Sequence, residues 1–265
     1  MHGQLAKPSG APYMCRMTAP NIRARLFVED DLLAAAQIGP TREQQHYLLN
    51  VMRLRDGEAM ALFNGRDGEW RALFRRDGRR DCRLIVESRM RPQLAAADLW
   101  LLFAPVKKAR LDFIAQKACE MGCSRIWPVR TDHTQVTRVN DDRMLANAIE
   151  AAEQTERLDI PAIQQFTPLA EALDACGADR RLIFCDEAIA GDASANPISV
   201  LSEAGPISSA AVLIGPEGGF SDDERALIAR RQNSLKLSLG PRILRADTAA
   251  IAALTCFQSV CGDWL

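Results

Sequence analysis

The sequence contains no run of about 18 consecutive apolar residues, so no membrane-spanning helix is expected. Residues 1–20 lack the apolar core of a secretory signal and are expected to form a loosely ordered tail. Histidine is scarce, with three among 265 residues, and none of the eight cysteines forms a CxxC pair, so no metal site is expected. Without a secretion signal, the thiols are expected to be free and the protein cytoplasmic.

Charge is nearly balanced over the whole sequence but is divided unevenly along it. The formal net charge is −1, yet residues 1–92 hold 16 Lys and Arg against 11 Asp and Glu, a net charge of +5. Residues 93–265 carry a net charge of −6. A basic front segment favours a polyanionic partner, although a solvated surface of uneven charge gives the same count.

Residues 21–92 have the pattern of a small β-rich domain. Asp-Gly and Asn-Gly pairs at 56–57, 64–65, 67–68 and 77–78 separate the apolar segments AMALF, WRALF and CRLIV. This spacing predicts short strands in a small sheet or barrel. Residues 41–54 predict a helix with Thr41 as its N-cap, and Pro92 with the Ala-rich stretch after it indicates a domain boundary.

Residues 93–265 alternate between strand and helix patterns. Strands are predicted at 98–105, 125–129, 181–186, 210–215 and 235–239, and helices at 108–121, 142–156, 169–176, 221–231 and 248–260. The 221–231 helix opens with Ser-Asp-Asp-Glu, which is a capping box. The alternation predicts an α/β domain with a mainly parallel sheet covered by helices.

The most informative segment is Ile214–Ser221, where a buried strand ends in the loop GPEGG and a capped helix follows. Ligands bind at the carboxyl ends of strands in open parallel sheets, and glycines there let the backbone approach a ligand closely. A tight turn would use the same glycines, but the loop is longer than a turn needs. It lacks the Lys-Ser/Thr of a P-loop and the GxGxxG of a dinucleotide site, which disfavours both classes.

A second strand ends in Gly240-Pro241, before an apolar helix expected to begin near Thr248. Two arginines, Arg242 and Arg245, flank Ile243 and Leu244 in this loop. They either pair with acidic residues at the edge of the sheet or belong to a binding site. Two strand-end loops of this kind suggest one shared pocket, and therefore an enzyme.

The segments 214–224 (IGPEGGFSDDE) and 237–249 (LSLGPRILRADTA) together closely resemble the signature motifs of the RsmE-type 16S ribosomal RNA (uracil N3)-methyltransferases of the SPOUT superfamily. Residues 106–130 and 148–161 also resemble helices and turns of that family. In front, RLFV, HYLLNVMRLRDGE and LFNGRDGEW resemble its PUA-like RNA-binding domain. The resemblance covers residues 23–262.

The resemblance implies an N-terminal PUA-like β-barrel domain at residues 21–92 and a C-terminal SPOUT α/β trefoil-knot domain at 93–265. It implies S-adenosyl-L-methionine as the cofactor, bound between the knot loops. The residues that it assigns to cofactor binding are Gly215, Pro216, Glu217, Gly218, Leu237, Leu239, Gly240, Ile243 and Leu244.

The same resemblance implies a homodimer and a partner that is 16S ribosomal RNA or the small ribosomal subunit. The apolar last helix suits either a dimer interface or burial in its own core. For RNA contact we expect the basic residues Arg25, Arg53, Arg55, Arg66, Lys107 and Arg242. A solvated basic face is the alternative for this set.

The reaction implied is transfer of a methyl group to N3 of a uridine, whose N–H must lose its proton. We expect Arg245 to contact the uracil or its phosphate, and Glu217 or Asp247 to act as a base or to hold the loops. His133 follows a strand and is expected to make a loop hydrogen bond. The alternatives are another SPOUT methyltransferase acting on tRNA or ribose, and a non-catalytic RNA-binding assembly factor.

Overall fold

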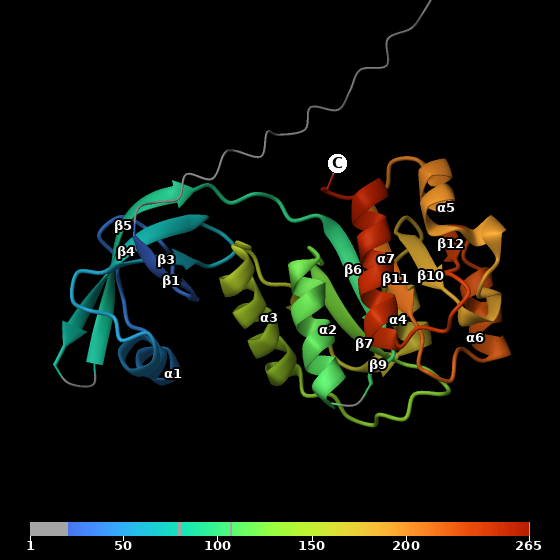
Figure 1. The fold of residues 1–265 in the computed structure, drawn as a ribbon, viewed down its shortest axis with the longest axis horizontal. Coiled ribbons are helices and arrows are strands. Elements are labelled where there is room, and N and C mark those ends of the chain that lie inside the picture. Colours follow the sequence, from blue (N-terminus) through green and yellow to red (C-terminus); the bar gives the residue numbers. More distant parts are fainter. Residues whose placement is uncertain (1–20, 79–80, 107, 265) are drawn as a thin grey trace, which may run out of the picture.

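The computed structural model describes residues 21–78, 81–106 and 108–264. Its described part contains two sheets joined by the segment at 92–97, which has no regular structure (Figure 1). The tail expected at residues 1–20 and the RNA contact expected at Lys107 lie outside the described residues.

The first sheet is mixed and five-stranded, with the order β1-β3-β4-β5-β2. Its strands are β1 (Ile22–Phe27), β2 (Gln37–Ile38), β3 (Ala59–Phe63), β4 (Glu69–Asp77) and β5 (Asp81–Arg91). The β1–β3 pair is parallel and the other pairs are antiparallel. The apolar segments AMALF, WRALF and CRLIV lie in β3, β4 and β5, so the turn spacing located these strands correctly.

The helix predicted at 41–54 is present but shorter. Helix α1 (Arg42–His46) begins at Thr41, whose side chain forms a capping box with Gln44 as expected. It continues as a π-helical turn, η1 (Tyr47–Val51), and ends there because Arg53 takes a left-handed conformation with φ of 52°.

The second sheet has seven strands, and all of its strand pairs are parallel. Its strands are β6 (Asp98–Phe103), β7 (Arg125–Arg130), β8 (Ala162–Ile163), β9 (Thr167–Pro168), β10 (Arg181–Cys185), β11 (Ser209–Ile214) and β12 (Ser234–Leu237). The order is β12-β10-β11-β6-β7-β8, and β9 pairs with β7. The parallel α/β architecture expected from the alternation is confirmed.

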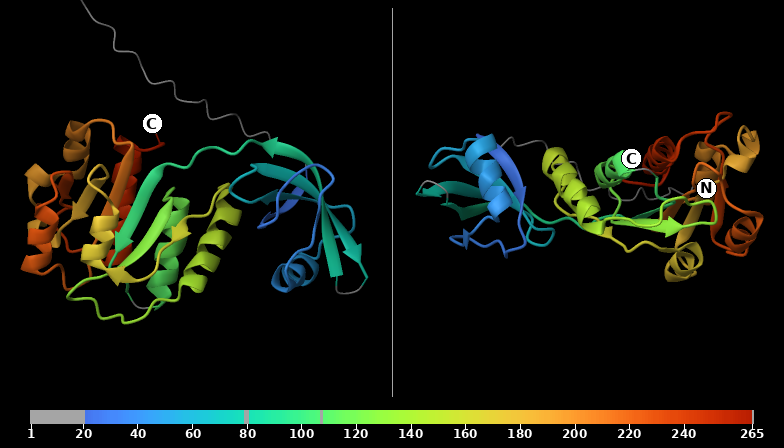
Figure 2. Two further views of the ribbon diagram at one scale, coloured as in Figure 1. Left: turned by 180° about the vertical axis from the view of Figure 1, so that it is seen from behind. Right: turned by 90° about the horizontal axis from the view of Figure 1, so that it is seen from below.

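Helices cover both faces of this sheet (Figure 2). They are α2 (Lys108–Glu120), α3 (Asp141–Thr155), α4 (Leu169–Ala175), α5 (Pro197–Ala204), α6 (Asp222–Ala229) and α7 (Ala246–Val260). Successive residues of β6 explain the two layers, because side chains alternate along a strand. Leu101 and Phe103 pack with α2, α3, α5 and α7, whereas Trp100 and Leu102 pack with α4 and α6.

Some elements were not predicted from the sequence. Helix α5 and the two-residue strands β2, β8 and β9 are too short to show a clear periodicity. Helix α7 begins at Ala246, two residues before the expected start, and Arg245 is its N-cap residue without a capping hydrogen bond. The buried residues of α7 face its own domain, including Ala253, Leu254 and Phe257.

The chain after β12 lies against the connection between β10 and α5, which contains the 3-10 turns η2 (Glu187–Ile189) and η3 (Ala193–Ala195). Ser238 N donates to Ala195 O at 2.8 Å, and Gly191 N donates to Gly240 O at 3.0 Å. No helix in the described part of the chain is both long and apolar enough to cross a membrane.

The two sheets are joined through Arg25 of β1, whose side chain is 11 % exposed. Its Nε donates to Glu69 Oε1 at 2.7 Å, and its terminal nitrogens donate to the carbonyl oxygens of Ala152, Glu153 and Arg157 around the end of α3. The guanidinium also lies 4.6 Å from the centre of the Phe63 ring. All of these acceptors belong to the protein, so Arg25 joins the domains and does not belong to an RNA-facing surface.

We predict that Arg25→Ala lowers the free energy of unfolding by about 3 kcal/mol, because it leaves buried acceptors unpaired at the junction. Chemical denaturation followed by tryptophan fluorescence measures this change. Arg23→Ala is the matched control on the same strand, because Arg23 is 58 % exposed and lies 3.7 Å from Glu58. Its cost is expected to stay below about 1 kcal/mol, and equal losses in the two variants would contradict the role of Arg25.

Candidate functional site

A pocket lies at the carboxyl ends of the three adjacent strands β12, β10 and β11, beside the first turns of α7. This is the edge at which open parallel sheets bind ligands. The lining residues are Cys185, Asp186, Glu187, Ala190, Ile214, Gly215, Pro216, Glu217, Leu237, Leu239, Gly240, Arg242, Ile243, Leu244, Ala246 and Ala249.

The two motifs identified in the sequence meet in this pocket. Eight of the nine residues expected to bind a cofactor line it, namely Gly215, Pro216, Glu217, Leu237, Leu239, Gly240, Ile243 and Leu244. Gly218 is the exception, and a Cβ added to it would lie 3.3 Å from the Cβ of His133. The prediction of one pocket shared by two strand-end loops therefore agrees with the geometry.

Two glycines show why these loops need their residue types. A Cβ on Gly215 would lie 2.5 Å from Cε2 of Phe220, so a side chain there would displace a buried ring. Gly240 has φ of 98°, a conformation that other residues adopt only with strain. The first glycine permits close packing beneath the loop, and the second permits the turn that directs residues 241–244 over the pocket.

A third loop, which follows β10, also contributes to the pocket and was not assigned to it from the sequence. It supplies Asp186, Glu187 and Ala190, and Cys185 at the end of β10 lines the pocket beside them. This loop has no run of glycines, but a signal was present, because the buried strand RLIFC ends directly in two acidic residues. Ala246 and Ala249 of α7 were missed as well, and their small side chains leave space beside the loops.

Asp186 is the buried carboxylate of the pocket, with no exposed side-chain surface. Burial raises its pKa, but hydrogen bonds from Lys236 and from the Ala188 N–H, with the charge of Arg225, hold the pKa below its ordinary value. Lys236 Nζ lies 3.0 Å from the carboxylate, and Arg225 Nε lies 3.2 Å from it. Asp186 is therefore charged at neutral pH and fixed in place.

The neighbouring thiol of Cys185 is neutral at the same pH. Burial raises its pKa to about 12. A thiolate is the reactive form of cysteine, so this side chain forms an apolar wall of the pocket and is not a nucleophile.

Arg110 of α2 brings together the two carboxylates that the sequence suggested as candidate bases. Its Nη1 lies 2.6 Å from Oε1 of Glu217, and its Nε lies 3.9 Å from Oδ2 of Asp247. Glu217 belongs to the loop after β11, whereas Asp247 lies in the first turn of α7. The guanidinium thus joins helix α2 to the loop after β11 and to the first turn of α7.

The GPEGG loop is supported from outside by the loop that follows β7. His133 Nδ1 lies 3.0 Å from Gly219 O, which is the loop hydrogen bond expected for this residue. Glu224 accepts hydrogen bonds from the N–H groups of Asp132 and Ser221, both at 2.9 Å. These bonds hold the glycine-rich loop against the sheet.

The two arginines of the second motif are exposed at the rim of the site. Arg242 lines the pocket, whereas Arg245 lies at the N-cap position of α7, next to it. Ile243 lies between them in the sequence and is 75 % exposed. Both guanidinium groups therefore remain open to a substrate that approaches the pocket.

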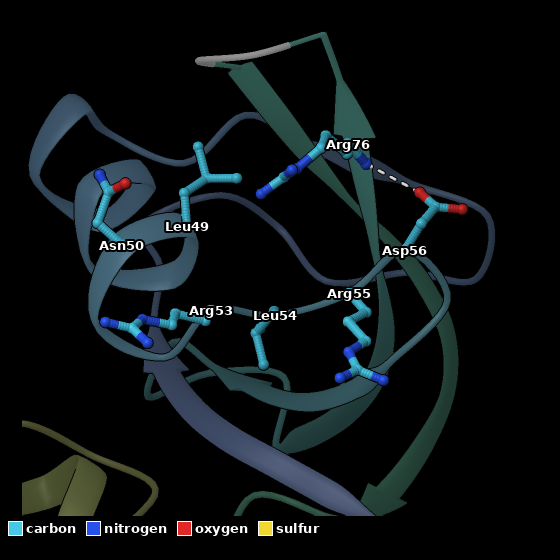
Figure 3. Close-up of a pocket in the computed structure, with 7 residues that line it drawn as sticks. All are labelled: Leu49, Asn50, Arg53, Leu54, Arg55, Asp56 and Arg76. Carbon is cyan, nitrogen blue, oxygen red and sulfur yellow. Dashed lines mark hydrogen bonds between the residues drawn. The ribbon is translucent and has the colours of Figure 1, made fainter.

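The residues expected to contact RNA occupy different environments. Arg53 and Arg55 line a separate hollow in the first domain, together with Arg76 (Figure 3). Arg66 is exposed, and its Nη2 pairs with Asp31 and donates to Glu29 O, each at 2.9 Å. Arg25 is buried at the domain junction, as described above, and Arg242 lines the pocket.

Among residues 21–78, 81–106 and 108–264, no group of three or more His, Cys, Asp or Glu side chains is arranged to hold a metal ion. The free cysteines of this part of the chain are mostly buried.

Family models identify both parts of the chain. Residues 93–258 match the model described as an RNA methyltransferase domain, and residues 40–87 match an RNA methyltransferase PUA domain. The ribosomal RNA small subunit methyltransferase E of Rickettsia conorii is 30% identical over 231 residues, which cover 87% of this chain and 93% of that protein.

Solved structures of similar proteins share the fold. A Legionella pneumophila methyltransferase, solved in complex with bound SAM, is 28% identical with a TM-score of 0.77, covering 89% of this chain and 97% of its own. The ribosomal RNA small subunit methyltransferase E of Neisseria gonorrhoeae, solved bound to S-adenosyl methionine, is 23% identical with a TM-score of 0.80. That match covers 91% of this chain and 99% of the other and shows the shared fold.

These matches confirm the fold class, which is an α/β SPOUT domain preceded by a PUA-like domain. The family models cover most of the described residues, and one relative is 30% identical over 87% of this chain. The chain therefore belongs to the RNA methyltransferase family that includes the ribosomal RNA small subunit methyltransferases E.

Proposed function

We propose that this enzyme transfers a methyl group from S-adenosyl-L-methionine to N3 of a uridine in 16S ribosomal RNA of the small subunit. The observation that carries the proposal is the pocket at the ends of β10, β11 and β12, which is lined by the two signature motifs of the family. The names of the relatives support the ribosomal RNA substrate. The bound cofactor of the Legionella structure supports the methyl donor.

The residues of the pocket fit S-adenosylmethionine. Leu237, Leu239, Ile243 and Leu244 offer apolar surface for an adenine ring, and Gly215 and Gly240 leave the backbone accessible for hydrogen bonds. The buried Asp186 carboxylate, held by Lys236 and Arg225, places a fixed negative charge at the wall of the pocket. When bound, the cofactor supplies an electrophilic methyl group on a sulfonium.

We propose that Arg245 contacts the uracil or its phosphate. N3 of uracil must lose its proton, and a guanidinium beside the ring stabilises the negative charge that develops on the base. Arg245 suits this role because it is exposed at the N-terminus of α7, beside the pocket. We assign Glu217 a catalytic role at the rim, where Arg110 holds its carboxylate.

We further propose that residues 21–92 form the RNA-binding unit and residues 93–265 the catalytic unit of a cytoplasmic homodimer. Arg53, Arg55 and Arg242 are exposed, and we propose that these three arginines contact the RNA. The exposed Ile243 at the rim of the pocket favours a partner chain nearby. The mass of the particle in solution tests the dimer.

The proposed reaction is tested with small subunits and naked 16S ribosomal RNA from a strain that lacks the enzyme. Incubation with labelled S-adenosylmethionine is expected to label one site, and nucleoside mass spectrometry is expected to identify N3-methyluridine. Label on a ribose or only on tRNA would point to another SPOUT activity. Normal N3-methyluridine in the ribosomal RNA of the deletion strain would rule out the proposed target.

We predict that Arg110→Ala weakens S-adenosylmethionine binding about two- to fivefold, the size expected for a partly exposed ion pair. The loop that carries Glu217 and the first turn of α7, which carries Asp247, lose the cation that joins them. Calorimetry measures the affinity, and Arg110→Lys is expected to recover part of it. Lys117→Ala is the control on the same helix, because Lys117 pairs with Glu120 at 2.7 Å. Unchanged affinity in Arg110→Ala would show that the loops do not need this contact.

We predict that Arg245→Ala lowers the rate of methyl transfer by about 100-fold, the loss typical of removing a donor that stabilises developing charge. Calorimetry is expected to show little change in cofactor affinity, because Arg245 does not line the pocket. Arg230→Ala, at the exposed C-cap of α6, controls for the loss of a surface charge. Near-normal turnover in Arg245→Ala would refute this assignment.

A further inference from the structure

A hollow in the first domain lies apart from the cofactor pocket (Figure 3). It is lined by Leu49, Asn50, Arg53, Leu54, Arg55, Asp56 and Arg76. Three of these seven residues are arginines, and they come from two separate segments of the chain. In Figure 3 the side chain of Arg76 extends from β4 toward Leu49, while Arg53 and Arg55 lie on either side of Leu54.

The backbone between η1 and β3 explains how Arg53 and Arg55 remain exposed. Leu54 is 2 % exposed, and its N–H donates to Leu48 O at 3.0 Å, so this residue anchors the segment in the core. Arg53 takes its left-handed conformation immediately before this anchor, at a cost of about 1 kcal/mol or more for a residue other than glycine. Both flanking arginines are held at the surface in consequence.

Among the described residues, the arginines of the hollow have no carboxylate partner, and Arg42 and Arg89, which also have none, lie outside the hollow. In the described ranges, no ion pair or side-chain hydrogen bond involves the guanidinium of Arg53, Arg55 or Arg76. Elsewhere in the same domain, Arg66 pairs with Asp31, Arg71 with Glu87, Arg75 with Asp56 and Arg83 with Asp77.

Asp56 is the carboxylate of the hollow, and it is already engaged. Its oxygens accept from the Arg76 N–H and from Arg75 Nη1, each at 2.9 Å. These two bonds hold the pKa of the Asp56 carboxyl below its ordinary value. The carboxylate thus orients the backbone of Arg76 and compensates Arg75, which leaves the three lining guanidinium groups with a positive charge to be neutralised.

We propose that this hollow is a binding site for a phosphodiester group of the RNA substrate, with Arg53, Arg55 and Arg76 as its cationic donors. The inference rests on the proposed function, because it assumes an RNA substrate. Guanidinium groups match phosphate geometry and form two parallel hydrogen bonds to it. The amide of Asn50 offers one further donor at the same hollow.

From its position in the fold, we infer that the hollow binds RNA that flanks the target uridine. Helix α1, beside the hollow, and the beginning of α7, beside the cofactor pocket, lie toward the same edge of the molecule in Figure 1. The Arg25 junction fixes the first domain against α3. An RNA that places a uridine at the pocket therefore reaches the hollow with a more distant part of its backbone.

The test uses the triple variant Arg53→Gln, Arg55→Gln and Arg76→Gln in the full chain. Its matched control is Arg23→Gln, Arg71→Gln and Arg83→Gln, which removes the same charge from ion-paired arginines of the same domain. Affinity for 16S ribosomal RNA is measured from 50 to 200 mM salt, since each lost phosphate contact lowers the slope of log affinity against log salt by about one.

The hollow variant is expected to lose about two units of slope and to raise KM for RNA at least tenfold, while the control stays within about half a unit of the wild type. Equal slopes in the two triple variants would overturn the proposal. A second outcome would also overturn the proposal: inorganic phosphate binds the hollow saturably, but its presence does not change the affinity for RNA. The hollow would then be a site for a free anion.

The outcome is separable from that of the proposed function. If the wild type methylates 16S ribosomal RNA and the two triple variants bind RNA alike, the proposal for the hollow is wrong and the proposed function is retained. If the wild type methylates no RNA, the function fails, and the salt slopes still decide whether the hollow holds a phosphodiester.

Discussion

The pocket depends on the parallel pairing of β12, β10 and β11 as neighbours in one sheet. Parallel strands end at the same edge, so three loops separated by up to about fifty residues of sequence meet there. The backbone hydrogen bonds from Ser238 to Ala195 and from Gly191 to Gly240 then pack the last loop against the first. Without that order of strands, the two motifs would not face each other.

Two arginines join separate parts of the molecule, one by hydrogen bonds to backbone carbonyls and one by ion pairs. Arg25 fixes the first domain against α3, and Arg110 ties α2 to the loop after β11 and to the first turn of α7. These contacts join the first domain to the second and helix α2 to the rim of the pocket. The arginines that make these joints are paired with protein atoms, whereas those of the hollow are not.

Much of this architecture could be predicted because its signals are local. Capping boxes at Thr41 and Ser221 and the apolar strands placed the main elements, and the Gly-Pro strand ends at 215–216 and 240–241 located the pocket. Interactions between distant residues left no such signal. Arg25 has the appearance of a surface cation in the sequence, and its burial depends on carbonyl groups more than 120 residues away.

The same limit applies within the site. Asp186 follows a buried strand without a run of glycines, so the only local signal of its loop was the acidic pair at the end of that strand. The pairing of Arg110 with Glu217 crosses 107 positions of sequence. Arg76 belongs to β4, and it shares the hollow with Arg53 because the segment 49–56 lies against this strand, where Asp56 accepts from the Arg76 N–H.

The order in which the pocket is assembled has a consequence for the synthesis of the protein. Strand β12, its loop and the start of α7 supply about half of the lining, and all of them lie in the last 32 residues of 265. While those residues are still inside the ribosomal exit tunnel, the emerging chain has the first domain and most of the large sheet but no closed pocket. The pocket thus closes only after residues 237–249 have emerged, later than the first domain, which we propose to bind RNA.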